Sequence, residues 1–273
     1  MPYRKYLHNV LLGSTALVVA GAHLTGTTHE SGPVLNTAVE LVMGDTASTA
    51  DTASAVETAS TAVSLNVASA LDAVKSAVAP LSHPRALEDA FRSYFAYKST
   101  HPDAVKKPYL YFVDYGLPNT TPRGYVFDMS ARKVVEGPFM VAHGRGSAEN
   151  SHGVPTRFSN ASGSAATSLG LYVTQELYQF GGHSAGQFYS SVGMRLMGVS
   201  GKWNSNARAR GVVAHGAPYV TASRAGRSEG CPAMDQSRAK RLLPKLANGA
   251  LVFLFAPDPN WLQKDPWVLA STN

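Results

Sequence analysis

One cysteine and one histidine are the residues of this chain best suited to covalent chemistry. Cys231 is the only cysteine among 273 residues and lies in the run Ser-Glu-Gly-Cys-Pro over 228–232. The preceding Gly230 has no Cβ, so backbone N–H groups there can approach the group that the sulfur attacks. His215 lies 16 residues upstream and ends the apolar run Gly211-Val212-Val213-Ala214, which predicts a short buried strand. A strand-end histidine and a loop cysteine that meet in space form a base and a nucleophile.

The structural alternative is a buried cysteine that acts as a small hydrophobe, beside a histidine that only satisfies its own hydrogen bonds. The residues around Cys231 favour the catalytic interpretation. Arg224, Arg227, Ser228 and Glu229 form a polar, basic and flexible neighbourhood of the kind that exposes a thiol and lowers its pKa. We therefore expect the thiol pKa to lie below the ~8.5 of a free cysteine.

A family resemblance rests on the same residues. Val213-Ala214-His215-Gly216 and the run from Gly226 to Ala233 resemble the catalytic signature of the L,D-transpeptidases, the YkuD-like cysteine enzymes that cross-link bacterial peptidoglycan. The likeness is closest to the branch in which Pro-Ala follows the cysteine, and it covers roughly residues 108 to 256. Better-known members have His in place of Glu229, and Arg or Asn in place of Ala233.

The resemblance implies a role for each residue of this set. The Cys231 thiolate attacks the carbonyl that precedes the terminal D-alanine of a stem peptide, and His215 passes the thiol proton to the leaving amine. The backbone carbonyl of Gly216 orients the imidazole of His215. Ser228 is the serine of the His, Ser, Gly and Cys set that the signature contains. The backbone N–H groups of Cys231 and Gly230 are expected to bind the oxyanion, at about 3 kcal/mol for each well-aimed donor.

Two further groups are candidates for substrate binding. Arg227 and Arg224 either bind a stem-peptide carboxylate or are ordinary surface charges. His183 and Ser184 lie in a G-x-S-x-G run that matches the elbow of serine hydrolases, a fold that needs an acid and then a histidine downstream. No acid separates Ser184 from His215, the last histidine of the chain. We interpret the run as a turn that lines the site, with His183 in contact with substrate.

Other site classes fit less well. Gly144-Arg145-Gly146 hints at a phosphate loop, but position 149 is Glu and no Gly-Lys-Ser follows. The histidines show neither HExxH nor paired-cysteine spacing, so no metal and no cofactor is expected. Papain-like and cell-wall cysteine peptidases place the cysteine before the histidine, the reverse of the order here.

The first 22 residues have the pattern of a secretory signal peptide. Arg4 and Lys5 precede an apolar run from Val10 to Val19 and the small-residue site Ala20-Gly21-Ala22. The alternative is an uncleaved anchor. Removal leaves a net charge of about +4 with no basic stripe, which favours an anionic wall polymer over nucleic acid as the partner. We expect a secreted monomer in the periplasm or cell envelope, without stable membrane insertion. A lone thiol in an exported protein cannot form an internal disulfide, which also favours catalysis.

Residues 23–83 are expected to form a low-complexity spacer rich in Ala, Ser and Thr. Asp-Thr-Ala-Ser recurs at 45 and 51, and Glu-Thr-Ala-Ser follows at 57. Next, a narrow face of Val63, Val67, Leu71, Val74 and Val78 predicts a helix before Pro80, either weakly docked or disordered.

The catalytic domain is predicted over residues 84–273. It starts with a helix after Pro84, and a late helix has Asp235 as its N-cap and Pro244 as a kink. Strands are predicted at Tyr109–Asp114, Tyr125–Met129, Phe139–Ala142, Leu169–Thr174, Val212–His215 and Leu251–Phe255. The strands do not alternate with helices, which excludes a doubly wound sheet and favours a β-rich α+β class. The resemblance implies a mixed β-sheet sandwich with peripheral helices.

The sequence is compatible with three functions. An L,D-transpeptidase uses an amine acceptor, whereas an L,D-carboxypeptidase or endopeptidase uses water on the same acyl-enzyme. A non-catalytic peptidoglycan-binding module would retain the fold with a redundant thiol.

Overall fold

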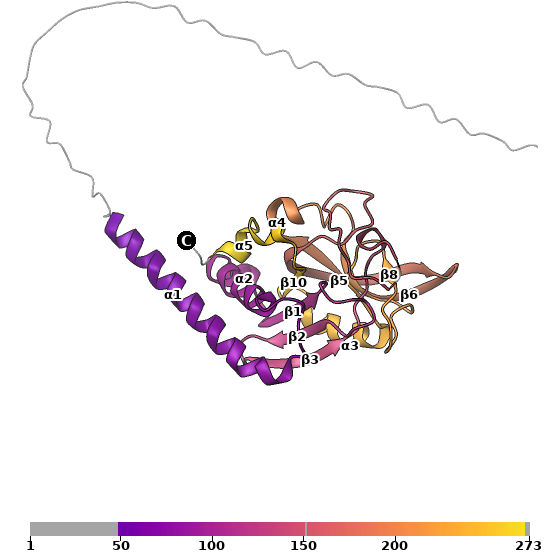
Figure 1. Ribbon diagram of the computed structural model, residues 1–273, viewed down its shortest axis with the longest axis horizontal. Helices are drawn as coiled ribbons and strands as arrows, with labels where there is room; N and C mark the ends of the chain where they lie inside the picture. Colours follow the sequence, from indigo (N-terminus) through magenta and orange to yellow (C-terminus); the bar gives the residue numbers. More distant parts are fainter. Residues whose placement is uncertain (1–48, 151, 271–273) are drawn as a thin grey trace, which may run out of the picture. The chain divides into compact units, whose positions relative to one another are not determined.

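The computed structural model describes residues 49–150 and 152–270, with side chains from residue 57 onward (Figure 1). The expected signal peptide and the first part of the expected spacer lie outside the described residues. Among the helices of the described part, none is long and apolar enough to cross a membrane.

An eight-stranded mixed sheet organises the domain, in the order β3-β2-β1-β10-β5-β6-β7-β9. β1 pairs with β10 in parallel, β7 pairs with β9 in parallel, and the other neighbours are antiparallel. A separate parallel ladder joins β4 and β8. The strands are β1 Tyr109–Asp114, β2 Gly124–Asp128, β3 Lys133–Phe139, β4 His143–Gly144, β5 Gly170–Ser184, β6 Gln187–Gly198, β7 Val213–Gly216, β8 Arg227–Ser228, β9 Ala233–Met234 and β10 Leu251–Phe255.

Helices cover both faces of this sheet. Residues paired directly across neighbouring strands share a face of the sheet. Phe127 is linked through Leu110 and Leu251 to Val173, so Phe127 and Val173 lie on the same face. On that face Phe91 of α2 meets Phe127 edge-on. Thr174 points to the opposite side and donates its hydroxyl to the carbonyl of Leu246 at the end of α3. The helices are α1 Thr49–Val74, α2 Ala86–Thr100, α3 Gln236–Leu246, α4 Pro259–Leu262 and α5 Pro266–Leu269. The expected β-rich α+β fold with a mixed sheet and peripheral helices is confirmed.

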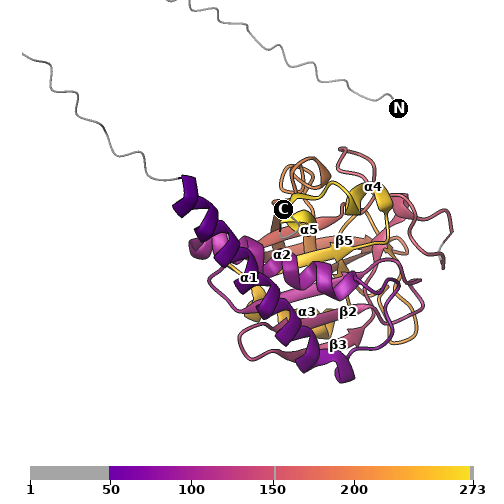
Figure 2. The same cartoon turned by 60° about the vertical axis from the view of Figure 1, so that its left-hand side comes forward.

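The N-terminal helix α1 belongs to the same hydrophobic core as the sheet. Val63, Val67, Ala70 and Val74 are buried, and α1 lies beside α2 in both views (Figures 1 and 2). The sequence pattern identified this valine face but led us to expect weak docking or disorder. The face is narrow, yet α2 and the edge strand β3 supply an apolar surface for it that no local pattern indicates.

The link after α1 is also tied to the domain. Ser82 donates both its backbone N–H and its hydroxyl to the Asp114 carboxylate, at 2.7 and 2.6 Å. The backbone N–H of Ala79 donates to the Tyr125 hydroxyl at 2.9 Å. The spacer expected to reach residue 83 is therefore shorter than the sequence suggests, because its last part packs and hydrogen-bonds as part of the domain.

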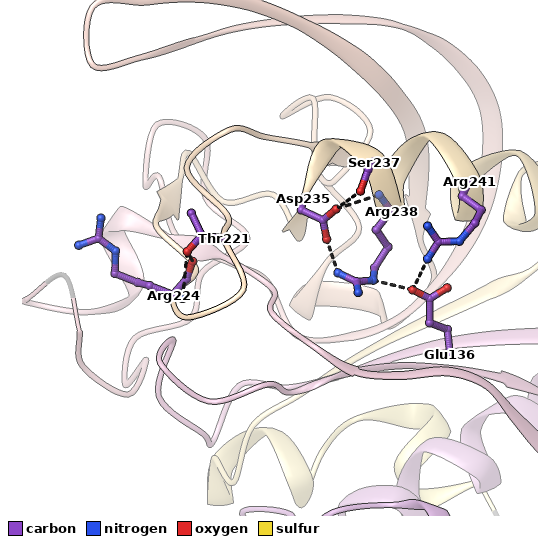
Figure 3. A network of polar contacts seen from close by, with 7 residues as sticks. All are labelled: Glu136, Thr221, Arg224, Asp235, Ser237, Arg238 and Arg241. Carbon is purple, nitrogen blue, oxygen red and sulfur yellow. Dashed lines mark hydrogen bonds and ion pairs between the residues drawn. The ribbon is translucent and has the colours of Figure 1, made fainter.

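The helix that precedes β10 forms as its capping signals predict. The Asp235 side chain accepts from the Arg238 backbone N–H at 2.9 Å, which is an N-cap. Arg238 and Arg241 also bind Glu136 on β3 and so fasten α3 to the sheet edge (Figure 3). Pro244 lies in the last turn and does not end the helix, which continues to Leu246.

The sequence did not predict the long hairpin of β5 and β6. Only the first part of β5 was expected as a strand, and β6 was absent from the expected set. The hairpin turns at Ala185-Gly186, with φ values of +49° and +77°, as a two-residue turn between right-twisted strands requires. The G-x-S-x-G run is therefore a hairpin tip, not a nucleophile elbow.

Candidate active site

The loop that carries Cys231 is held at both ends by short parallel ladders. At its start, Arg227–Ser228 pairs with His143–Gly144, and at its end Ala233–Met234 pairs with His215–Gly216. Both partners occur in the same four-residue sequence, Val-Ala-His-Gly. The cysteine thus lies midway between two anchored strand ends, where backbone movement is restricted.

Inside the loop, Ser228 closes a tight turn around Cys231. Its hydroxyl donates to the Cys231 carbonyl at 2.7 Å and accepts the Gly230 N–H at 3.1 Å. Gly230 has φ +123°, and a Cβ there would lie 2.8 Å from the Ala166 carbonyl oxygen, so glycine is required.

This turn changes the expected oxyanion site. The Gly230 N–H was expected to be a donor, but it is already bonded to the hydroxyl of Ser228. Among the described residues, none accepts the Cys231 backbone N–H. The Cys231 N–H is therefore the donor of this loop that is available to a developing oxyanion.

The thiol of Cys231 is less acidic than the sequence led us to expect. The residue is partly accessible, with Sγ 3.9 Å from the Gly211 carbonyl oxygen. Burial raises the pKa of Cys231 to about 11, although the Val213 backbone N–H and the Arg210 cation each favour the thiolate. The predicted pKa below 8.5 is wrong because desolvation by the surrounding strands outweighs the nearby positive charge.

His215 is set up as a neutral base. The side chain is 3% exposed, and burial lowers the pKa of His215 to about 4. Its Nδ1 lies 3.1 Å from the Gly216 carbonyl oxygen, the contact that the family resemblance implied. A carbonyl only accepts, so Nδ1 carries the proton and Nε2 is left with a lone pair.

Strand β7 brings the base and the nucleophile together. The backbone N–H of His215 points to the Pro232 carbonyl at 3.4 Å, directly after the cysteine in sequence. Two residues earlier on β7, the Val213 N–H favours the ionised sulfur through a hydrogen bond. Base and thiol are therefore both positioned by one four-residue strand.

The expected substrate-binding arginines are not brought to the sulfur. Arg224 is exposed, its backbone is bonded to the Thr221 hydroxyl, and its guanidinium extends away from the cluster at the start of α3 (Figure 3). Arg227 is half-buried on β8 beside His143. Neither contributes to the pKa shift of Cys231, whereas Arg210 does.

His183 and Ser184 lie far along the hairpin from His215. In the cross-strand register, His215 is level with Gly193 and Tyr178. His183 lies five residues further along β5, a displacement of about 16 Å at ~3.3 Å per residue. There it meets the ring of Phe188 at the exposed tip. The hairpin, rather than its tip motif, is the part that lines the site.

Sequence reasoning missed an aromatic wall beside His215. The ring of Phe180 stacks on the imidazole, with centroids 4.0 Å apart and planes at 20°. Tyr178 and Tyr189 each meet the Phe180 ring, and Tyr219 meets Tyr189. Burial raises the pKa of all three tyrosines, and the negative charge of an ionised Cys231 contributes, so these side chains lie near the thiol. The alternation of aromatic residues at 178 and 180 is the signal that identifies this strand face.

The second Val-Ala-His-Gly histidine has a structural position. His143 is fully buried and accepts a hydrogen bond on Nδ1 from Arg123 Nη2 at 2.9 Å. Arg123 also donates to the Val141 carbonyl through Nε and Nη2. Burial and the adjacent guanidinium lower the pKa of His143 to about 3, so this imidazole is neutral and supports β4 from within.

No group of three or more His, Cys, Asp or Glu side chains in the described ranges is arranged to hold a metal ion. The chemistry available here is that of a thiol, a neutral imidazole and a backbone N–H.

Comparison with known proteins identifies the family of this chain. The L,D-transpeptidase catalytic domain family matches residues 80–255, well over half of the chain, and the chain belongs to this family. No curated protein matches the chain. A solved structure of an L,D-transpeptidase from Mycobacterium smegmatis is similar over 55% of this chain, at 14% identity and a TM-score of 0.32. The chain spans 59% of the length of that solved protein.

Proposed function

We propose that this protein is an exported L,D-transpeptidase that cross-links peptidoglycan stem peptides through an acyl group on Cys231. One observation carries the proposal. His215 is buried and neutral, its Nδ1 is held by the Gly216 carbonyl, and its strand also positions the loop of the single cysteine. Membership of the L,D-transpeptidase family supplies the substrate class, a peptide of the bacterial wall.

The proposed reaction begins from a neutral thiol and a neutral imidazole, since the pKa of Cys231 is about 11 and that of His215 about 4. As Sγ bonds to the carbonyl carbon before the terminal D-alanine, the thiol proton passes to His215 Nε2. The carbonyl electrons move onto oxygen, where the Cys231 N–H donates to them.

Collapse of this intermediate reforms the carbonyl and breaks the bond to D-alanine. The imidazolium gives its proton to the departing amine, which leaves a thioester on Cys231. An acceptor amine then loses a proton to His215 and attacks the thioester. The carbon–sulfur bond breaks, the sulfur is protonated again and the cross-linked peptide leaves.

Export and location belong to the same proposal. The signal-peptide pattern of residues 1–22 and the absence of a second cysteine in the sequence both suit the periplasm or cell envelope. The substrate lies in that compartment.

Incubation of the protein with a disaccharide-tetrapeptide, followed by mass spectrometry, tests the function. We expect a dimer whose mass equals that of two monomers minus one molecule of free alanine, and no product from Cys231→Ala. Loss of alanine without a dimer assigns the water-using L,D-carboxypeptidase instead. Binding to peptidoglycan sacculi without any product indicates that the protein is a non-catalytic peptidoglycan-binding module.

A further inference from the structure

Arg210 is half-buried beside the active site and is fixed by four hydrogen bonds. Its Nη1 donates to the carbonyl of Ser159 at 2.7 Å and to the hydroxyl of Ser168 at 3.4 Å. Its Nη2 donates to the carbonyl of Ala166 at 2.8 Å and to the hydroxyl of Ser164 at 3.1 Å. We call residues 159–168 the wall segment. A planar guanidinium is suited to such a fork of contacts, whereas a lysine ammonium is not.

The wall segment touches the catalytic loop at its most crowded point. A Cβ on Gly230 would lie 2.8 Å from the Ala166 oxygen and 3.5 Å from Arg210 Nη2. Gly144, on the strand that anchors the start of the loop, is packed against Ala165 and Gly230 in the same way. Arg210 fixes the position of the wall segment. The position of Gly230, and with it the backbone of Cys231, therefore depends on Arg210.

Arg210 also lies three residues before the start of β7, the strand that carries His215. The next residue, Gly211, has its carbonyl 3.9 Å from the sulfur of Cys231. Arg210 is the cation that lowers the pKa of Cys231, opposed by the negative charge of Glu229. Glu229 is exposed and paired with Arg145, so solvent screens it more than a half-buried, anchored guanidinium.

The other titratable groups around the sulfur are uncharged at neutral pH. They are the base His215, with its lowered pKa, and the tyrosines with raised pKa values at 115, 172, 178, 189 and 219. Among the described residues, Arg210 and Glu229 are thus the charged groups that bear on the thiol.

We propose that Arg210 is a positioning residue that holds the wall segment against Gly230 and supplies the fixed positive charge that favours negative charge on the Cys231 sulfur. The guanidinium of Arg210 is already hydrogen-bonded to the wall segment, so it does not move during the reaction. It acts through its electric field at the sulfur and by fixing the position of the loop that carries Cys231. The role toward the thiol is independent of the substrate. A corresponding role toward the oxyanion rests on the proposed transpeptidase function.

The test measures alkylation of Cys231 by iodoacetamide at pH 9 in the full chain, followed by intact mass. Arg210→Gln is expected to lower the second-order rate constant about three- to tenfold, since one pKa unit changes the thiolate fraction tenfold below the pKa. Arg210→Lys keeps the charge and is expected to stay within about twofold of wild type while melting at a lower temperature. Arg208→Gln, an exposed neighbour paired with Glu176, is the control and leaves the rate unchanged.

Two results overturn the proposal. An unchanged alkylation rate in Arg210→Gln removes the electrostatic role. An equal loss of alkylation rate in Arg210→Gln and Arg210→Lys shows that the Arg210 side chain only holds the wall segment in place and that its charge has no effect on the thiol. If Arg210→Gln does not fold, the Lys variant alone decides, because a tenfold loss there contradicts the proposal. Alkylation needs no peptidoglycan, so a failure of the proposed transpeptidation leaves this result readable.

Discussion

The ring of Phe180 lies flat against the imidazole of His215, with ring centroids 4.0 Å apart. This contact couples His215, the proposed base, to the hairpin of β5 and β6, from which Phe180 projects. It also removes water from one face of the imidazole, which contributes to the burial that lowers the pKa of His215 to about 4.

Phe180→Ala is expected to admit water to the imidazole and raise the pKa of His215 toward its ordinary value of 6.5. The base must be neutral to accept the thiol proton, so the acid limb of the pH–rate profile should move to higher pH. Half-burial of the ring limits the stability loss to about 1–2 kcal/mol. The matched control is Phe188→Ala at the hairpin tip, 66% exposed. An acid limb that stays in place in Phe180→Ala contradicts the role of this stacking.

Ser228→Ala removes both hydrogen bonds that close the turn around Cys231. We expect the rate constant for dimer formation to fall at least about tenfold with little change in KM, because the oxyanion donor loses its fixed position. The stability cost should be about 1 kcal/mol. Ser228→Thr retains the hydroxyl and should recover much of the rate. Equal loss in both variants would point to crowding in the turn instead of the hydrogen bonds.

The reactivity of the thiol toward iodoacetamide should reflect its raised pKa. The rate should keep rising with pH beyond 8.5, since burial raises the pKa of Cys231 to about 11. In denaturant the same cysteine should show the midpoint of an ordinary thiol, near pH ~8.5. Intact mass after timed alkylation gives both profiles. A native midpoint below pH 8 would restore the acidic thiol that the local sequence suggested.

Acid should destabilise the fold through the buried histidines His143 and His215. His215 and His143 have pKa values lowered to about 4 and about 3, so below pH 6.5 the unfolded chain binds protons that the native state does not. The contribution of these histidines to the free energy of unfolding is therefore fully present above pH 6.5. It falls as the pH drops toward 4, by up to about 1.4 kcal/mol per pH unit for each histidine.

Urea unfolding at several pH values measures this slope. His143→Gln can still accept from Arg123 but does not titrate, so its slope between pH 6 and 4 should be smaller than that of wild type. An identical slope would show that His143 is not kept neutral by the fold.

The helix α1 should contribute measurably to stability. Val67→Asp places a charge in the hydrophobic core that α1 shares with the sheet and is expected to cost about 2–4 kcal/mol. Leu65→Asp, on the same helix but 67% exposed, should change stability by less than about 0.5 kcal/mol. A chain that begins at Ser82 should melt at a lower temperature than the full chain. If all three melt like wild type, residue 84 is the true domain boundary.

The sequence by itself predicted Cys231 and His215 as a reactive pair, because the signals that single them out are local. Cys231 is unique, a glycine and a polar turn precede it, and a short apolar strand ends at His215. The same kind of signal located β1, β10 and the N-cap of α3 at Asp235, where a few adjacent residues specify the conformation.

Only the tertiary structure decided the environment of that pair. The stacking of Phe180 on His215, the contact of Arg210 with the wall segment and the burial of Val67 in the core of the sheet each join residues far apart in sequence. The direction of the thiol pKa depended on this as well. Charged neighbours in the sequence suggested a low value, but desolvation comes from strands that the fold brings together, and it is the larger effect on Cys231.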